Sequence, residues 1–96
     1  MPCQMIVHAF PNGNNPDGMK KYRTEGPAIV TQYGGRHISM GKPQVVEGDF
    51  QFPFVIISEW PSRDAALRFW NSPEYTALKK FREGTGDYQI YLVDTK

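Results

Sequence analysis

The fold of this chain is decided by the stretch FVIISEWPSRDAALRFWNSPEY, residues 54–75. Its start predicts a buried strand, because both alternating sets of side chains in the first four residues are apolar. A helix should follow, since Ser62 can cap a helix N-terminus and Asp64 places a negative charge in the first turn. The same capping pattern recurs at Ser72 and Pro73. We therefore expect the helix to break and restart there.

The remaining strands are predicted from apolar runs that lie next to turn-forming residues. The first run is Met5–Phe10, which a cluster of proline, asparagine, aspartate and glycine follows. A second strand is expected over His37–Glu47, with an interruption at residues 41–43. The last strand is expected over Tyr88–Val93, where bulky residues favour β-structure.

One further helix is expected between the first two strands. Asn15 can cap its N-terminus, and Pro16 suits the first helical position, where an N–H would have no partner within the helix. The pair Gly26-Pro27 predicts a kink or a restart, since proline removes a backbone donor and crowds the preceding turn. Gly34 should end the helix, because glycine adopts the left-handed conformation at low cost.

The resulting order of elements is strand, helix, strand, strand, helix, strand. This βαββαβ order predicts the ferredoxin-like fold of the α+β class, with an antiparallel four-stranded sheet and both helices on one face. The chain has 96 residues, of which 40% are apolar and 22% charged, as in ordinary globular proteins. We expect residues 1–96 to form a single ferredoxin-like domain.

Composition excludes several classes of function. A formal net charge of +1 provides no long-range attraction for nucleic acid or an anionic membrane. The basic clusters at residues 20–23 and 79–82 are interpreted as solvated helix faces. No run of apolar residues is long enough to cross a bilayer, and no secretion signal is recognisable at the start of the chain. A single cysteine, Cys3, fits a reducing cytoplasmic location and allows neither an intramolecular disulfide nor a multi-cysteine zinc site.

The two apolar faces of the strand at residues 54–60 predict a homodimer. Phe54 and Ile56 should face one side of the sheet, and Val55 and Ile57 the other. Two helices can cover only one side. We expect an identical sheet to cover the second side, so that two subunits pair through their sheet faces as a dimeric α/β barrel.

Four short motifs indicate a family resemblance. They are YGGR at residues 33–36, VEGD at 46–49, SEWPS at 58–62 and FWNSPEY at 69–75. Together they resemble the domain of unknown function family 1330, in the superfamily of dimeric α/β barrels. The resemblance covers nearly the whole chain in order and implies no particular activity. It does imply a pocket between sheet and helices, which elsewhere in the superfamily serves cofactor-free monooxygenases, isomerases and haem-binding proteins.

His37 and Glu59 are the candidates for a catalytic base. His37 can exchange a proton near neutral pH, and we place it on the same strand face as Ser39. The alternative is an ordinary hydrogen-bonded strand histidine, and His8 is a weaker candidate of the same kind. Glu59 interrupts an apolar strand, so it is either a buried base of raised pKa or the partner of Arg36 in a structural ion pair.

Aromatic residues near the two helices are candidates for binding a flat organic ligand. Trp60 belongs to this group, although aromatics at such spacing are more often plain core. Tyr75 is the strongest candidate, because a helix that restarts after Pro73 can direct its hydroxyl into a cavity. The expected ligand-binding residues are Tyr33, Arg36, His37, Glu59, Trp70 and Tyr75.

The favoured function is therefore the binding of a small, partly aromatic organic molecule between sheet and helices. The alternative is a cofactor-independent monooxygenase or isomerase that uses His37 or Glu59 as general base. A tautomerase with a free amino group on Pro2 is a weaker reading, because it rests on one residue. We expect no cofactor and no metal, since no phosphate-binding glycine loop and no metal-ligand spacing is recognisable.

Overall fold

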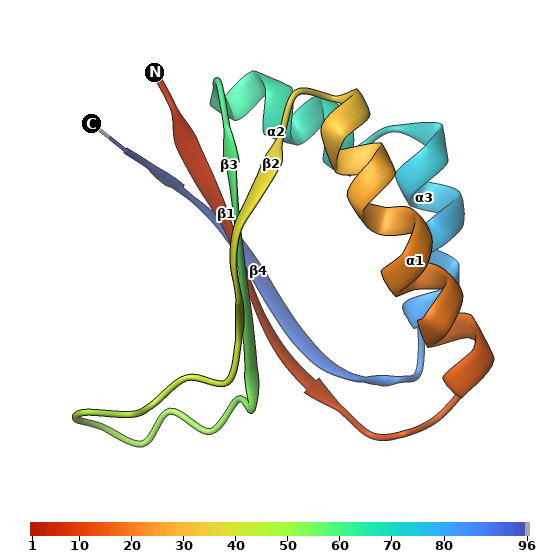
Figure 1. Cartoon of the computed structure of the whole chain (residues 1–96), viewed down its shortest axis with the longest axis vertical. Coiled ribbons are helices and arrows are strands. Elements are labelled where there is room, and N and C mark those ends of the chain that lie inside the picture. Colours follow the sequence, from red (N-terminus) through yellow and green to blue (C-terminus); the bar gives the residue numbers. More distant parts are fainter. Residues whose placement is uncertain (96) are drawn as a thin grey trace.

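A computed structural model describes residues 1–95 of the chain. It has two layers, with a twisted four-stranded sheet on one side and all helices on the other (Figure 1). The elements in chain order are β1 (Cys3–Pro11), α1 (Pro16–Gln32), β2 (Arg36–Gly41), β3 (Phe54–Trp60), α2 (Arg63–Trp70), α3 (Pro73–Lys79), the short 3₁₀ helix η1 (Lys80–Arg82) and β4 (Gly86–Asp94).

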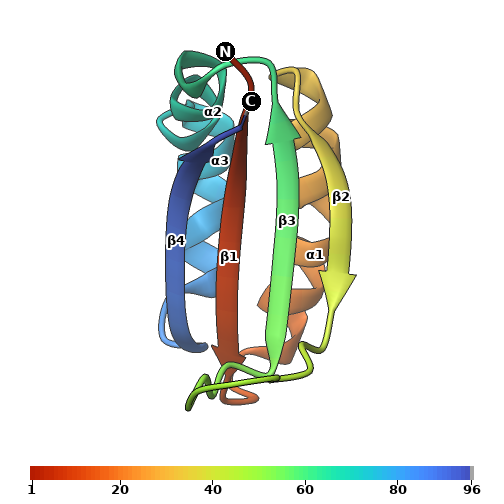
Figure 2. The ribbon, with the colours of Figure 1, turned by 90° about the vertical axis from the view of Figure 1, so that its left-hand side faces the viewer.

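The strand order is β2-β3-β1-β4, and every neighbouring pair is antiparallel (Figure 2). Strands β1 and β3 are central, and β2 and β4 form the edges. This is the arrangement expected from two interleaved βαβ units, because β3 lies between β1 and β2 of the first unit, and β1 lies between β3 and β4 of the second. The predicted α+β, ferredoxin-like fold is confirmed.

All three predicted helix starts carry the expected cap. The side-chain oxygens of Asn15, Ser62 and Ser72 accept hydrogen bonds from backbone N–H groups at 3.2, 3.0 and 3.1 Å. Ser72 separates α2 from α3, so the predicted break at Pro73 is confirmed. The caps therefore set where the helices begin.

The predicted restart at Gly26-Pro27 is wrong, because α1 is one helix that continues through Pro27. Tyr22 before the proline and Val30 after it both pack on the same buried cluster. Burial on both sides of the proline outweighs the lost backbone hydrogen bond. The predicted end of the helix is confirmed, since Gly34 follows it with φ of 90°.

The predicted second half of the strand over His37–Glu47 is also wrong. Strand β2 ends at Gly41, and no strand follows before Phe54. Pro43 explains the early end, since it lacks the N–H needed to extend the ladder with β3. Residues 42–53 instead form a loop that projects away from the helices at one end of the sheet (Figure 1).

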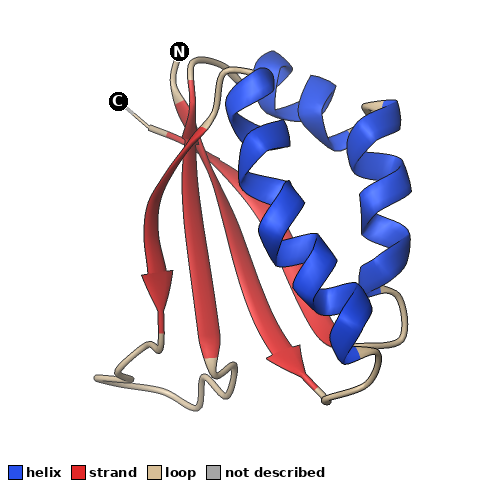
Figure 3. Cartoon of the chain, turned by 45° about the vertical axis from the view of Figure 1, so that its right-hand side comes forward, coloured by secondary structure: helices blue, strands red, loops and turns tan. Residues whose placement is uncertain are grey.

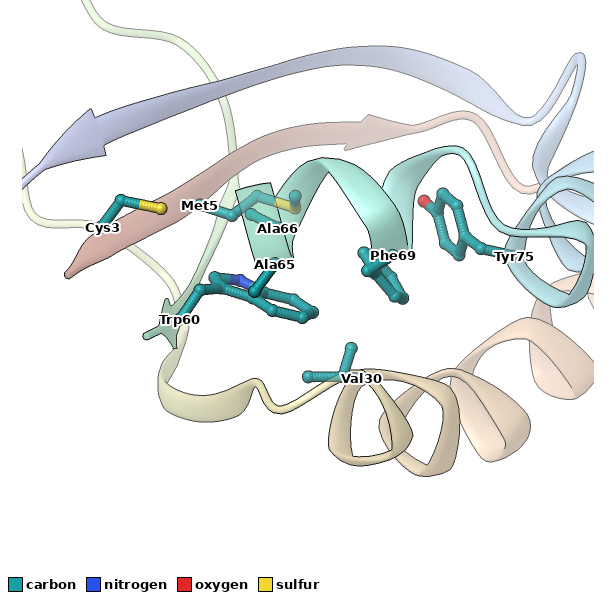
Figure 4. Packing of buried hydrophobic residues seen from close by; sticks show 8 residues of the cluster. All are labelled: Cys3, Met5, Val30, Trp60, Ala65, Ala66, Phe69 and Tyr75. Atoms are coloured by element: carbon teal, nitrogen blue, oxygen red, sulfur yellow. The ribbon is translucent and has the colours of Figure 1, made fainter. Parts of the chain in front are cut away.

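The buried core lies between the sheet and α2. It consists of Cys3, Met5, Val30, Trp60, Ala65, Ala66, Phe69 and Tyr75 (Figure 4). Trp60 is 1% exposed, and its Nε1 donates to Ser58 Oγ at 3.0 Å. Tyr75 lies at the end of the cluster away from Cys3, with Phe69 between it and Trp60 (Figure 4). The end of the core next to α3 is therefore formed by aromatic side chains.

The other face of the sheet carries no helix (Figure 3). Its central rows pair Ile6 with Ile57 and Tyr91, and His8 with Val55. Val93 of β4 shares this side and is 42% exposed, while Tyr91 is 43% exposed. We call these residues, Ile6, His8, Val55, Ile57, Tyr91 and Val93, the open sheet face. The predicted alternation in β3 is confirmed, with Ile57 on the open sheet face and Ile56 on the helix side.

Candidate functional site

Polar side chains gather between the helix layer and β4, next to the apolar core. Tyr22 comes from α1, Tyr75 from α3, Arg82 from η1, and Thr85 and Tyr88 from the turn and first residues of β4. We call these five residues the tyrosine–arginine cluster. The strand period places Tyr88 on the helix side of β4, in line with Ile90 and Leu92.

The hydroxyls of Tyr22 and Tyr75 are 2.6 Å apart and share a hydrogen bond. The rings meet edge to face, with centroids 6.1 Å apart. Burial raises the pKa of Tyr22 well above its ordinary value, because the phenolate would be poorly solvated there, and the neighbouring Tyr75 adds to the rise. The nearby Arg82 opposes this rise only in part. Tyr22 is therefore a neutral hydrogen-bond donor at physiological pH, and not a base.

The guanidinium of Arg82 lies against two tyrosine rings. Its central carbon is 4.6 Å from the ring centroid of Tyr88 and 5.8 Å from that of Tyr22. The Nε atom is buried, and no hydrogen-bond partner for it exists among residues 1–95. A cation in this position, beside ring faces and without a carboxylate, is uncommon inside a protein.

The turn before β4 is held by hydrogen bonds on both sides. Thr85 donates its hydroxyl hydrogen to the Arg82 carbonyl, and the Tyr88 hydroxyl lies 2.7 Å from Thr85 Oγ1. Asn12 and Asn14 donate side-chain N–H groups to the Gly84 carbonyl at 3.2 and 3.3 Å. The loop after β1 thereby positions the turn that carries Arg82 and Tyr88.

A hollow of about 470 Å³ opens at this turn. It is lined by Lys79, Arg82, Glu83, Gly84, Gly86, Asp87 and Tyr88. A second hollow, of about 350 Å³, lies at the opposite end of the sheet near Arg36, Glu59 and Trp60. The first one reaches two members of the tyrosine–arginine cluster, so it is the better candidate for a ligand site.

The two predicted catalytic bases lie elsewhere. Glu59 accepts hydrogen bonds from Arg36 at 2.6 and 3.1 Å on the helix-free side of the sheet, which is the arrangement of the structural ion pair. His37 is exposed on the edge strand and lies opposite Ser58, whereas Ser39 lies opposite Ile57. A register shift between His37 and Ser39 turns them to different faces, so the prediction that they share one face is wrong.

The aromatic candidates are closer together. The rings of Tyr75 and Trp70 pack at a tilt, with centroids 5.3 Å apart, and the Lys79 ammonium lies 4.6 Å from the Trp70 ring centroid. The Tyr33 hydroxyl donates to Glu74 at 2.9 Å, which raises the pKa of Tyr33. The pKa of Glu74 is lowered, mainly by a backbone hydrogen bond to its carboxylate and next by the bond from Tyr33. Among residues 1–95, no hydrogen bond or ion pair joins His37 to any other predicted ligand-binding residue. The structure thus groups Trp70 with Tyr75, and Arg36 with Glu59, and leaves His37 apart.

None of Tyr22, Arg82 and Tyr88 is among the residues predicted from the sequence to bind a ligand. Arg82 was grouped with exposed basic residues, yet it is partly buried. The sequence does contain a signal that Arg82 faces the interior, in its helical spacing from other residues. Tyr75, Leu78 and Arg82 are spaced by three and four residues, which places them on one helix face. The other two members of that face are buried.

Over residues 1–95, no three His, Cys, Asp or Glu side chains gather as a metal site would require. Within the same residues, no helix is both long and apolar enough to pass through a bilayer.

The family model DUF1330, a domain of unknown function, matches residues 5–96. The chain belongs to the DUF1330 family. A match over nearly the full length agrees with the motifs at residues 33–36, 46–49, 58–62 and 69–75. No curated protein sequence is similar enough to this DUF1330 chain to count as a relative.

Solved structures similar to this DUF1330 protein share its fold at low sequence identity. The RPA0582 protein of unknown function from Rhodopseudomonas palustris is 18% identical with a TM-score of 0.78, over 99% of this chain and 82% of that one. A dimeric ferredoxin-like protein of unknown function from Jannaschia sp. CCS1 is 8% identical with a TM-score of 0.75, over 99% and 100%. SnoaB, a cofactor-independent oxygenase from Streptomyces nogalater, is 14% identical with a TM-score of 0.68, over 99% and 93%. At these identities the likeness extends to the fold alone.

Proposed function

We propose that this protein binds a small, partly aromatic organic molecule between its helices and its sheet, at the tyrosine–arginine cluster. The observation that carries the proposal is the hollow of about 470 Å³ lined by Arg82 and Tyr88. Its volume lies within the range of about 300–1,000 Å³ common for ligand sites. The ring of Tyr88 offers an aromatic surface for stacking, and nearby hydroxyls offer directional hydrogen bonds.

Native mass spectrometry of the protein purified from its own source tests the proposal. We expect a fraction of the protein to carry an additional small-molecule mass, and the variant Tyr88→Ala to lose it. Leu67→Ala is the control, because Leu67 is 41% exposed on α2, away from the hollow. Protein that carries no additional mass in either form, under gentle ionisation, would contradict the proposal.

The functional unit is proposed to be a homodimer that pairs the open sheet faces. The support is physical, because no helix among residues 1–95 covers the patch that contains Ile57, Tyr91 and Val93, and burial of each such side chain contributes roughly 1.5–3 kcal/mol. Similar structures are described as dimeric ferredoxin-like proteins. Light scattering should give the mass of two chains, and a monomer at micromolar concentration would contradict the proposal. A cytoplasmic location belongs to the same proposal and is supported by the single, buried Cys3.

The second candidate is a cofactor-independent monooxygenase or isomerase, because SnoaB, which has the same fold, is a cofactor-independent oxygenase. The bases proposed for this chemistry are His37 and Glu59. Oxygen uptake with a panel of polyphenols would test it, with His37→Ala and Glu59→Gln as variants. If uptake occurs and neither variant slows it at least tenfold, neither residue is the base.

A further inference from the structure

We propose that the tyrosine–arginine cluster binds an organic monoanion, with the guanidinium of Arg82 holding a carboxylate of the ligand. The inference rests on the proposed function and specifies the chemistry of the same site.

The electrostatics of Arg82 carry the inference. A guanidinium keeps its charge at every physiological pH, so partial burial cannot neutralise it as it could a lysine. Buried charges in folded proteins are usually paired, because desolvation of an unpaired charge is costly. Within residues 1–95, Arg82 forms no salt bridge, and its buried Nε has no hydrogen-bond partner. An external anion would supply the missing partner.

The geometry favours a planar anion. The rings of Tyr22 and Tyr88 lie against the guanidinium, at 5.8 and 4.6 Å from its central carbon. A carboxylate would be held at the edge of the guanidinium, which carries the N–H groups. That edge matches the two oxygens of a carboxylate, which can accept two parallel hydrogen bonds.

A further donor lies behind the lining of the hollow, in the paired hydroxyls of Tyr22 and Tyr75, neither of which lines the hollow itself. They lie 2.6 Å apart, and only one of their two protons is used in the bond between them. The second proton remains free to be donated to an acceptor. Because burial raises the pKa of Tyr22, this pair stays neutral and can donate at neutral pH.

The rim of the hollow limits the charge of the ligand. Glu83 and Asp87 line it together with Lys79 and Arg82. Both carboxylates are exposed, and neither lies within ion-pair distance of Arg82. They would repel a dianion such as a phosphate monoester more than a single carboxylate. The rim therefore favours a monoanion with an apolar, aromatic body.

Binding of matched acids and amides tests the inference. The probes are benzoate and 2-naphthoate, each compared with its neutral amide, benzamide or 2-naphthamide, by isothermal titration calorimetry. We expect each acid to bind at least tenfold more tightly than its amide, because charge-assisted bonds to a guanidinium are stronger than neutral ones. Arg82→Gln should weaken binding of the acids at least tenfold and leave the amides nearly unchanged.

Two further variants make the result interpretable. Arg68→Gln removes an exposed arginine from the end of α2 and should bind the acids as the unmodified protein does. Arg82→Lys keeps the charge without the planar fork and should retain a reduced preference for acids. It also serves if Arg82→Gln fails to fold, because it retains the cation over the tyrosine rings.

Failure of the inference and failure of the proposed function give different results. Equal affinity for acids and amides, unaffected by Arg82→Gln, would overturn the carboxylate assignment and leave small-molecule binding intact. Absence of binding by all four probes up to 10 mM, together with no co-purified mass, would overturn both.

Discussion

At the scale of single residues, the contact between Gly35 and Trp60 limits what the core can accept. A Cβ added to Gly35 would lie 2.7 Å from three ring atoms of Trp60, which is 1% exposed and cannot move into solvent. We predict that Gly35→Ala lowers the free energy of unfolding by about 1–3 kcal/mol through overpacking.

Gly41→Ala provides the matched control for this variant. Gly41 lies in the same strand region, and an added Cβ would meet nothing within 4 Å. Urea unfolding of both variants is the measurement. Equal midpoints for Gly35→Ala and Gly41→Ala would show that the indole is not the constraint.

A second prediction at this scale concerns the pH dependence of stability. Burial raises the pKa of Tyr22 above its ordinary value of 10.0, so above that pH the unfolded chain releases a proton that the folded chain keeps. The contribution of Tyr22 is complete below pH 10 and is lost as the pH rises from there toward the folded pKa. We expect a loss of up to about 1.4 kcal/mol between pH 8 and pH 11.

Tyr22→Phe should remove this part of the pH dependence. The measurement is the urea midpoint of both proteins at pH 8, 10 and 11. The comparison between them cancels the titration of lysines and of the other tyrosines. A decline of the same size in Tyr22→Phe would mean that Tyr22 ionises as freely in the folded chain as in the unfolded one.

Features that depend on neighbouring residues in the chain were predicted correctly from the sequence. Features that depend on contacts between side chains of distant elements were not. Ser62, Ser72 and Gly34 were assigned correctly, because capping and left-handed turns depend on neighbours in the chain. Arg82 was misassigned, because its burial depends on Tyr22 and Tyr88, which lie in other elements. Local sequence patterns do not reveal a candidate-site residue whose burial depends on distant elements. For Arg82, the one local signal is its helical spacing from Tyr75.

At the scale of elements, Ser72 joins two helices and positions Tyr75. Its hydroxyl donates to the Phe69 carbonyl at 2.8 Å and accepts from the Tyr75 N–H at 3.1 Å, and the residue is 4% exposed. We predict that Ser72→Ala lowers the free energy of unfolding by about 1–2 kcal/mol, since it removes a cap and leaves the Tyr75 N–H without its partner, while the Phe69 carbonyl still accepts from the Ser72 N–H.

The neighbouring residue is a suitable control for the cap. Asn71 is exposed and has no side-chain hydrogen bond within residues 1–95, so Asn71→Ala should change the unfolding midpoint little. Thermal and urea unfolding of both variants test the difference. If the two variants lose the same stability, the Ser72 cap contributes nothing specific.

The extent of strand β2 was predicted incorrectly because the strand lies at the edge of the sheet. The sequence from His37 to Glu47 has β-forming residues near both ends, Ile38, Val45 and Val46, but an edge strand is supported by one neighbour only. Pro43 stops its ladder, and the register shift after His37 changes which side chains face the helices. Strict alternation therefore holds for the central strand β3 and fails at this edge.

At the scale of the whole molecule, the open sheet face sets the proposed assembly. Val93 on this face is 42% exposed, and Leu67 on the helix side is 41% exposed, which makes them a matched pair. We predict that Val93→Lys weakens dimerisation at least tenfold, because a charge would have to be buried between the sheets. Leu67→Lys should leave it unchanged.

Sedimentation equilibrium across micromolar concentrations is the measurement for both variants. If Val93→Lys and Leu67→Lys stay equally dimeric, the subunits pair through a different surface. Circular dichroism of each variant controls for loss of fold.

The overall topology was predictable from the sequence because it follows from the order of strong local signals. The apolar faces, the capped helix starts and the break at Pro73 permit few arrangements of the four strands and the helices between them. The site was less predictable, since it forms where α1, α3, η1 and β4 converge from distant parts of the chain.

The strand order also has a kinetic consequence during synthesis. Strand β1 is made first, yet its two neighbours, β3 and β4, begin only at Phe54 and Gly86. At roughly 5–20 residues per second, β1 waits for several seconds before its second partner emerges. This apolar segment, which will lie at the centre of the sheet, has free edges on both sides until β3 is made, and one free edge from then until β4 is made. The nascent chain should therefore depend on chaperones until β4 is complete, and a pause in translation near Gly84 would lengthen that exposure.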